Sequence, residues 1–592
     1  MTSAAGGGEM SISKCACLLA MLCAASTVSI FGQNRPFSPV PWPESPEPFV
    51  LGVGSTFSAS GGKPRSSGLR TETVAADFEE ALAIIRKHYV SGGSIKPDEV
   101  TGSAITSMLK ALDPHSNFYD VSEFQELLGE HESEYTGTGS SIAAFVVNGR
   151  IETFILSVFP NSPAAKAGLR FGDRIIAVDG KQVSGSSPDQ VRLLVRGKRG
   201  SIAKMTIERA VTLAVETIVL WRDRVHEPAV PKGLLLKGNI GYIDLTNGFS
   251  NATFSEFESA MSGLQKLGMT SLILDLRGNG GGILDQAIRV AEKYLPVGAT
   301  IVSQRGRLAG DTRTWTAAGA RHELMPLVVL VDEDTASASE VLAGALQDND
   351  RAIVIGRKTF GKGLVQSVLN LPDGSGLTLT AARYFTPTGR SIQRDYSDTG
   401  LYDYFHHRGT VEIDKPSYTA RTPTGRIVRG GDGIMPDILV RPHQLLRSEA
   451  ALVDLLFLFS REYLGGRVSQ DTTPGNMPAH GIRQQLLMEK NLADDTMFER
   501  FRIFALSGEK GPKANVTSRE NEFVRSMLRY YLAMGASGLD SAKRARIDDD
   551  PEIKTAMMSV PEAARLAEAA RAVRRSPMKQ KSSPSLVLSE QR

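Results

Sequence analysis

The stretch LVVLVDEDTASASEVLAGALQDND, residues 327–350, joins an apolar, strand-like run to an amphipathic helix. Thr335, Ser337 and Ser339 alternate with alanine at the junction. A hydroxyl placed there can lie at the edge of a sheet, beside the first free N–H groups of the helix, which stabilise an anion. A serine nucleophile needs such donors for its oxyanion. Capping of the helix by one serine is the alternative interpretation.

Strands and helices alternate on both sides of this junction. The apolar runs GYIDL, SLILDL and RAIVIG alternate with the helical patterns FSEFESAMSGLQKLG and ILDQAIRVAEKYL. This alternation, within residues 213–445, predicts an α/β core with a largely parallel sheet.

A glycine-rich turn follows one of these strands, in LILDLRGNGGGILDQA, residues 272–287. Because glycine has no side chain, the backbone amides of this turn are unobstructed and can form a second wall of hydrogen-bond donors. The turn lacks the G-K-[ST] of a phosphate-binding P-loop and does not fit the dinucleotide pattern in full. We expect Asp275 and Arg277 to pair with each other or to shape the turn.

A lysine lies between two glycines in IGRKTFGKGLVQSV, residues 355–368. The apolar surroundings of Lys362 predict burial, which would lower its pKa and leave part of the amine neutral. A neutral lysine can remove the proton of a serine hydroxyl. We expect the neighbouring Lys358 to be a solvated surface charge.

Residues 135–212 change to short strand-like runs around PNSPAAKAGLRFGDRIIAVDGKQV, residues 160–183. This segment resembles a PDZ domain, in which S-P-A-x-x-A-G-L leads to G-D-x-I-x-x-V-[DN]-G.

Taken together, T-A-S-A-S-E, F-G-K-G, D-L-R-x-N-x-G-G and the inserted PDZ segment resemble the C-terminal processing peptidases, or tail-specific proteases. The resemblance covers roughly residues 75–445 and includes L-D-P-H-S at 112–116. It implies a multidomain α+β protein in which a crotonase-like (ClpP/crotonase) α/β serine peptidase core carries the PDZ domain and flanking helical segments. It also implies a catalytic Ser337, a basic Lys362, an orienting Gln366, and an oxyanion hole from the amides of Ala338 and of Gly281 or Gly282.

In this family the PDZ domain binds the tail of the substrate. The amides of Gly137, Thr138, Gly139 and Ser140 would accept the terminal carboxylate, and the peptide would add a strand beside SIAAFVV. Thr138 replaces the apolar residue usual in that loop, which leaves the ligand preference open. Val191 and Leu194 are candidate pocket residues, with ordinary core packing as the alternative.

The N-terminus predicts export. Lys14 precedes CACLLAMLCAASTVSIFG, which is typical of a signal peptide with cleavage after Ala25 or Gly32. An uncleaved membrane anchor is the alternative. The chain's three cysteines, at positions 15, 17 and 23, all lie in this segment. We therefore expect an exported protein of the bacterial periplasm or cell envelope.

The expected domain order combines these segments. A signal peptide (1–33) and a Pro/Gly/Ser-rich linker (34–72) precede an N-terminal helical domain (73–134), the PDZ domain (135–212) and the peptidase core (213–445). A C-terminal helical extension (446–570) and a basic disordered tail (571–592) follow; no motif assigns a role to the region after residue 445.

Composition and resemblance also bear on partners. A formal charge of +3 is too small to indicate a nucleic-acid partner. The resemblance implies unfolded or C-terminally exposed protein substrates, and neither a cofactor nor a metal ion. An adaptor or regulatory protein, an oligomer, and peripheral membrane contact through the basic tail stay open. The rival functions are a noncatalytic PDZ scaffold that binds C-terminal tails and, on the same core, an acyl-CoA enzyme.

Overall fold

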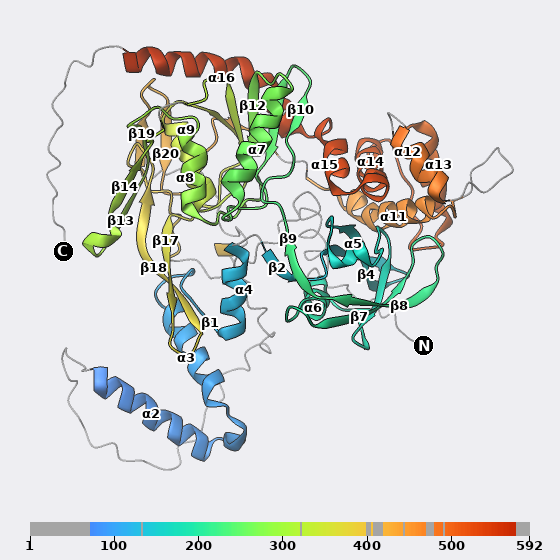
Figure 1. Ribbon diagram of the computed structural model, residues 1–592, viewed down its shortest axis with the longest axis horizontal. Coiled ribbons are helices and arrows are strands. Elements are labelled where there is room, and N and C mark those ends of the chain that lie inside the picture. The colour runs from blue at the N-terminus through green and yellow to red at the C-terminus, as the bar shows by residue number, and fades with distance from the viewer. Residues whose placement is uncertain are drawn as a thin grey trace, which may run out of the picture.

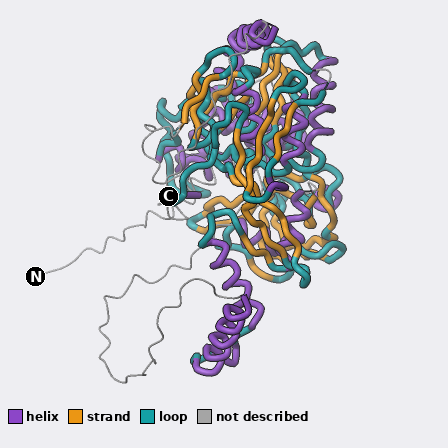
Figure 2. Tube along the Cα trace, turned by 90° about the vertical axis from the view of Figure 1, so that its left-hand side faces the viewer, coloured by secondary structure: helices purple, strands orange, loops and turns teal. Residues whose placement is uncertain are grey.

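The computed structural model describes residues 71–131, 134–319, 322–397, 404–405, 418–441, 444–468, 479–488 and 492–575. The expected signal peptide, with its three cysteines, and residues 34–70 of the expected linker lie outside the described residues. Among the described helices, none is long and apolar enough to cross a membrane. Figure 2 shows strands running through the body of the molecule with helices mostly around them.

A central sheet organises the core. Its strand order is β10 (Leu234–Leu236), β11 (Ile240–Asp244), β12 (Ser271–Asp275), β15 (Leu327–Val331), β16 (Ile353–Gly356) and β21 (Ile438–Leu439). All neighbouring pairs are parallel except β10 with β11. The parallel sheet predicted from the alternating pattern is therefore present. Every residue of β11, β12, β15 and β16 is buried, as expected for strands covered on both faces.

Helices cover both faces of this sheet. On one face lie α7 (Thr253–Lys266), α8 (Leu284–Glu292) and α9 (Ala338–Asp348). The long helix α16 (Pro551–Arg575) packs on the other face, where Ile553, Ala556 and Ala563 contact a cluster of strand residues that includes Ile273 and Ile355. Figure 1 shows α16, in red, lying across the top of the core. The C-terminal region thus completes the core.

A second, antiparallel sheet was not anticipated. Its strand order is β1 (Asn117–Tyr119), β18 (Gly376–Phe385), β13 (Thr300–Gly306) and β14 (Arg313–Thr316), and β17 (Leu364–Asn370) pairs with β18. Because β1 joins β18, the segment expected to be helical from 73 to 134 contributes a strand to the core. The rest of that segment comprises α2 (Thr71–His88), η1 (Gly92–Ser94), α3 (Pro97–Lys110) and α4 (Val121–His131).

The expected PDZ segment forms a separate antiparallel sheet. Its order is β3 (Ser140–Val147), β4 (Arg150–Val158), β5 (Arg174–Val178), β7 (Ile202–Glu208) and β8 (Val215–Trp221), with β6 (Lys181–Gln182) beside β5. Helix α5 (Pro163–Lys166) lies between β4 and β5 in the chain, and α6 (Pro188–Val195) lies between β6 and β7. The sheet continues past the expected boundary at residue 212, because the hairpin after β7 returns β8 to it. Strands β2 (Glu134–Gly137) and β9 (Asp223–His226) pair where the chain enters and leaves it.

Between the core strands and α16, the described residues form α11 (Arg447–Leu464), α12 (Ala479–Met488), α13 (Asp495–Ser507), α14 (Asn521–Ser537) and α15 (Leu539–Ile547). Helices α11 and α14 pack on one face of the PDZ sheet, and the other three pack against these two. The ring of Phe457 stacks on that of Phe145, with centroids 3.7 Å apart and planes at 4°. Arg461 donates through Nε to the carbonyl of Gly172 at 2.7 Å. The PDZ sheet and these helices therefore share one hydrophobic core.

Two smaller features complete the described chain. A short hairpin forms from β19 (Tyr418–Arg421) and β20 (Ile427–Gly430), and η2 (Ala309–Asp311) lies between β13 and β14. Residues 571–575 of the expected tail belong to α16, which continues to Arg575. The remainder of that expected tail lies outside the described residues.

Candidate active site

Ser337 lies where β15 gives way to α9, at the N-cap position of the helix. Its backbone is in the left-handed region, with φ 57° and ψ −119°. A non-glycine residue rarely adopts this conformation, and it is found where surrounding bonds enforce it, often at functional sites. The Ser337 side chain is half buried, whereas Ala336 and Ala338 on either side are buried. The turn therefore presents this one hydroxyl.

The glycine turn after β12 contacts the Ser337 loop. The φ of Gly281 is 102°, and a Cβ added there would lie 2.8 Å from both the Ala336 carbonyl oxygen and Ser337 Cβ. The same atom would lie 3.0 Å from the amide nitrogen of Ala338. Only glycine permits this approach of the two backbones. Asn279 links them further, because its carbonyl accepts from the Ala336 amide at 2.9 Å.

The amides nearest the hydroxyl differ in their hydrogen bonds. The Gly281 amide donates to Asn279 Oδ1 at 2.8 Å. Among the described residues, the amides of Ala338 and Gly282 have no hydrogen-bond partner. Gly282 is exposed and Ala338 sits at the first turn of α9. Of the two glycines considered from the sequence, Gly282 is therefore the one whose amide N–H has no acceptor among the described residues.

Glu340, which the sequence interpretation missed, connects the serine and lysine segments. This fully buried carboxylate accepts from the amides of Ser337 at 2.9 Å, Lys362 at 2.8 Å and Gly361 at 2.8 Å. It also accepts from the Thr359 hydroxyl at 2.5 Å. Burial raises the pKa of Glu340, and these four donors oppose the rise. A single side chain therefore joins the backbone at Ser337 to the segment that ends at Lys362, 22 positions after Glu340 in the sequence.

Lys362 is buried, with 9% of its surface exposed. Burial lowers the pKa of its amine to about 8, and the negative charges of Glu340 and Asp113 oppose this effect. Burial disfavours a charged amine because the low-dielectric surroundings solvate it poorly. The sequence prediction of a buried lysine with a lowered pKa is in accord with this environment.

The side chains of Ser337, Lys362 and Gln366 do not contact one another through any hydrogen bond among the described residues. Among the interactions of the described residues, no hydrogen bond connects Ser337 Oγ with Lys362 Nζ. Gln366 lies on β17 opposite Thr380, four positions beyond Lys362. Its Nε2 is buried and has no partner among the described residues. Catalytic hydrogen bonds often tighten only when substrate binds.

The D-P-H-S turn approaches the lysine from the N-terminal segment. Asp113 accepts from the amides of His115 and Ser116, each at 2.8 Å. Burial lowers the pKa of His115 well below its usual value, and the positive charge of Lys362 adds to the effect. His115 Nε2 lies 2.9 Å from the hydroxyl oxygen of Tyr404. Within the described residues, no group of three or more His, Cys, Asp or Glu side chains is placed to hold a metal ion.

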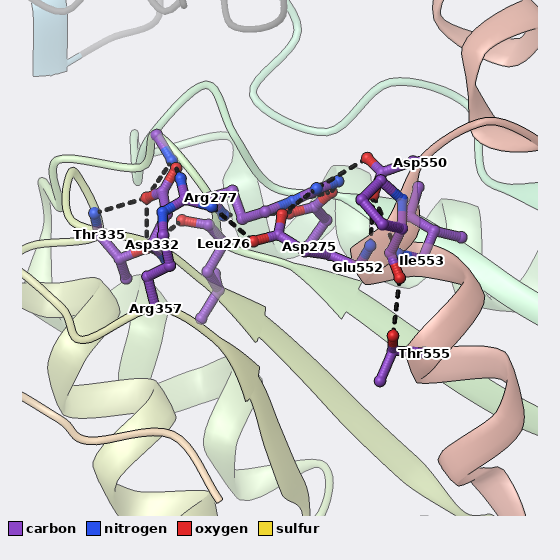
Figure 3. Close-up of polar contacts among 12 residues, drawn as sticks. Asp275, Leu276, Arg277, Asp332, Thr335, Arg357, Asp550, Glu552, Ile553 and Thr555 are labelled. Atoms are coloured by element: carbon purple, nitrogen blue, oxygen red, sulfur yellow. Dashed lines mark hydrogen bonds and ion pairs between the residues drawn. The ribbon is translucent and has the colours of Figure 1, made fainter. Parts of the chain in front are cut away.

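An ion-pair network lies behind the glycine turn, on the side of α16, and supports it (Figure 3). Arg277 pairs with Asp275 at 2.5 Å, one of the two roles considered from the sequence. Asp332 accepts through Oδ1 from the amides of Gly278 at 2.8 Å and Thr335 at 3.0 Å. Asp332 thus ties the glycine turn to the Ser337 loop. Asp550 and Glu552, which no sequence motif indicated, reach the same network from the start of α16.

The expected carboxylate loop lies between β2 and β3. Gly137 ends β2, and Ser140 begins β3. Thr138 is buried, and its carbonyl accepts from the Ala164 amide at 2.7 Å. Gly139 has φ 78°. Among the described residues, the amides of Thr138 and Gly139 have no partner, so both remain available to an acceptor.

The two candidate pocket residues on α6 differ in burial. Val191 is fully buried in the core of the PDZ sheet, which agrees with the alternative reading of it as a core residue. Leu194 is half buried and packs against the same core.

Known families match two parts of the chain. A model of peptidase family S41 matches residues 239–399, and a model of the PDZ domain matches residues 154–209. Together these two matches define the class as a PDZ-containing serine protease.

Relatives identify the family. The carboxy-terminal-processing protease of Bartonella bacilliformis is 38% identical over 324 residues, which are 54% of this chain and 72% of that protein. The carboxyl-terminal-processing protease of a Picosynechococcus species is 37% identical over 304 residues, 51% of this chain and 72% of that protein. The chain belongs to peptidase family S41 and is a serine protease of the carboxyl-terminal processing type, which confirms the resemblance drawn from its motifs.

A solved structure also matches. The photosystem II D1 C-terminal processing protease shares 30% sequence identity with a TM-score of 0.35, covering 64% of this chain and 95% of that one.

Proposed function

We propose that this protein is an exported serine endopeptidase that cleaves protein substrates near their C-termini, with Ser337 as nucleophile and Lys362 as general base. The observation that carries the proposal is the bond pattern of Glu340, whose Oε2 accepts from the amides of both residues. The strained backbone of Ser337 and the buried amine of Lys362 support the same roles.

The reaction begins with proton transfer. Neutral Lys362 takes the proton of Ser337, and the serine oxygen attacks the peptide carbonyl. The amide of Ala338 and that of Gly282, or of Gly281 once Asn279 releases it, hold the oxyanion. The protonated lysine then gives its proton to the leaving amine, and water hydrolyses the acyl-enzyme. Side-chain rotation on substrate binding brings Ser337 Oγ and Lys362 Nζ within hydrogen-bond distance.

Gln366 orients the lysine in this proposal. Its buried Nε2 has no partner among the described residues. A buried donor without a partner costs about 1–3 kcal/mol. A state in which the amide turns to a partner beside Lys362 relieves this cost, which supports coupling between rotation of Gln366 and assembly of the site.

The PDZ domain captures the tail of the substrate. The unpaired amides of Thr138 and Gly139 bind the terminal carboxylate, and Gly137 and Ser140 frame this loop. Strand β3 is an edge strand of its sheet, so an extended peptide can add beside it. Leu194 contacts the peptide from α6, with Val191 beneath it.

The proposed domain division keeps the order expected from the sequence, with the PDZ domain extended to include β8. A crotonase-like core is supported by the parallel sheet and the helices on its faces. Export, to the periplasm or cell envelope, rests on the signal-like residues 1–33. An adaptor protein and an oligomer remain compatible with this proposal.

Product mapping tests the proposal. An unfolded reporter with an apolar C-terminus is incubated with the parent and with Ser337→Ala, and the products are identified by mass. The proposal requires cleavage near the C-terminus by the parent alone. Amidation of the reporter's C-terminus removes the carboxylate and is expected to raise KM at least tenfold. Tail binding without cleavage by the parent would favour the noncatalytic scaffold instead.

A further inference from the structure

Two carboxylates at the start of α16 reach the network behind the glycine turn. Asp550 caps the helix, because its Oδ1 accepts from the amides of Glu552 at 2.9 Å and Ile553 at 3.0 Å. Its second oxygen, Oδ2, lies 2.7 Å from Nη1 of Arg277. The cap therefore holds Asp550 in a fixed orientation toward the turn.

Glu552 bridges two arginines. Its Oε2 lies 2.5 Å from Arg277 Nη1, and its Oε1 lies 2.5 Å from Arg357 Nη1. The Glu552 residue is 5% exposed, and the Arg277 side chain is 15% exposed. Short, largely buried contacts between charged groups are strong and directional, so they fix the relative positions of the elements that carry them.

The two arginines contact the two segments that form the candidate active site, the glycine turn and the Ser337 loop. Arg277 directly precedes Gly278, the first glycine of the turn. Arg357 follows β16 and pairs with Glu333 and, at 3.7 Å, with Asp332. Asp332 in turn accepts from the amides of Gly278 and Thr335. Figure 3 shows this chain of contacts from Asp550 and Glu552 to Thr335.

Packing of α16 does not require these charges. Its contact with the sheet is made by apolar residues, among them Ile553, Ala556 and Ala563. A helix that only covered the sheet would need no carboxylate aimed at Arg277. Removal of one partner from a buried ion pair is strongly unfavourable, so the remaining arginines would have to shift or find new acceptors.

We infer that Asp550 and Glu552 are positioning residues for the peptidase reaction, which hold the glycine turn and the Ser337 loop in register through Arg277 and Arg357. The inference rests on the proposed function, in which this turn supplies the oxyanion hole. It also gives the region after residue 445 a role in catalysis, although that region carries no recognisable catalytic motif.

The experiment compares Asp550→Asn, Glu552→Gln and a matched control, Asp549→Asn, in the full chain. Asp549 lies on the same turn but pairs with Arg529 of α14. Steady-state kcat and KM are measured on the unfolded reporter, and the affinity of the PDZ domain for a tail peptide is measured by fluorescence anisotropy. All rates are normalised to the folded fraction from circular dichroism, so a partly unfolded variant still reports its activity.

We expect kcat to fall at least tenfold in Asp550→Asn and Glu552→Gln, with KM and tail affinity within about twofold of the parent. Asp549→Asn should keep the parent kcat. Unchanged kcat in both test variants would overturn the inference, as would an equal loss in all three. Failure of the proposed function would look different, because the parent itself would then be no more active than Ser337→Ala.

Discussion

The backbone amides of Ser337 and Lys362 donate to the same atom, Oε2 of Glu340, at 2.9 and 2.8 Å. Glu340 stands three positions after the serine, at the start of α9, and its other oxygen holds the lysine loop through Thr359 and Gly361. The distance between the two segments is therefore set by one buried side chain. A substitution that changes the carboxylate oxygens of Glu340 should therefore shift the Ser337 and Lys362 segments together.

Glu340→Gln tests this relationship. The amide keeps the size of the side chain but replaces one acceptor oxygen with a donor, which leaves at least one buried N–H group unpaired. We expect the free energy of unfolding to fall by about 1–3 kcal/mol, and kcat/KM to fall at least tenfold. Urea unfolding and reporter cleavage measure the two effects. Full activity with parental stability would show that the shared acceptor is dispensable.

The pH dependence of activity should report the lysine. The pKa of Lys362 is lowered to about 8 by burial, and only the neutral amine can accept the serine proton. Below that pKa the fraction of neutral amine falls tenfold per pH unit, so kcat/KM should rise with pH and level off above about 8. Initial rates from pH 6 to pH 10 give the profile. A profile that is flat through pH 8 would contradict a lysine base.

Gly281→Ala tests the close approach of the turn to the serine. The new methyl group would lie 2.8 Å from Ala336 O and Ser337 Cβ, on a backbone with φ 102°. Loss of oxyanion stabilisation typically costs about 10²–10³-fold in kcat, and we expect a loss of that order. Gly263→Ala, in α7, is the control because nothing lies within 4 Å of its added Cβ. Parental kcat in Gly281→Ala would place the oxyanion hole elsewhere.

Phe457→Ala tests the contact between α11 and the PDZ sheet. Phe457 is fully buried and stacks on Phe145 of β3. Truncation of a buried phenylalanine usually costs about 3–5 kcal/mol. We expect a stability loss of this size in urea unfolding, together with faster proteolysis of the PDZ segment. Ile503→Ala removes a side chain that is 56% exposed and should have little effect. Equal stability of the two variants would argue against a shared core.

The sequence pointed to the serine junction, the glycine turn and the lysine because each follows an apolar strand, and the family resemblance then selected Ser337 among the three hydroxyls. Those strands, β15, β12 and β16, are parallel neighbours. The carboxyl ends of parallel strands meet at one edge of a sheet, where active sites of open α/β sheets form. Local patterns were therefore sufficient to predict that these three segments lie close together, while the roles of their residues came from the resemblance.

Glu340 and the C-terminal carboxylates could not be found in this way. Glu340 belongs to the T-A-S-A-S-E motif, and its spacing from Ser337 matches a capping box, but its second contact depends on how residues 359–362 fold back. Glu552 contacts Arg277 across 275 positions of sequence. No periodicity indicates such a pairing, since it arises only when α16 packs on the finished sheet.

The most direct test of the catalytic pair compares Ser337→Ala and Lys362→Ala with the parent in reporter cleavage. Ser339→Ala is a matched control, because the Ser339 hydroxyl is buried and has no partner among the described residues. Lys358→Ala is the control for the lysine. We predict that Ser337→Ala and Lys362→Ala each lose at least about 10³-fold in kcat/KM while remaining folded, and that both controls stay near the parent. Cleavage at the parental rate by Lys362→Ala would contradict the proposed dyad.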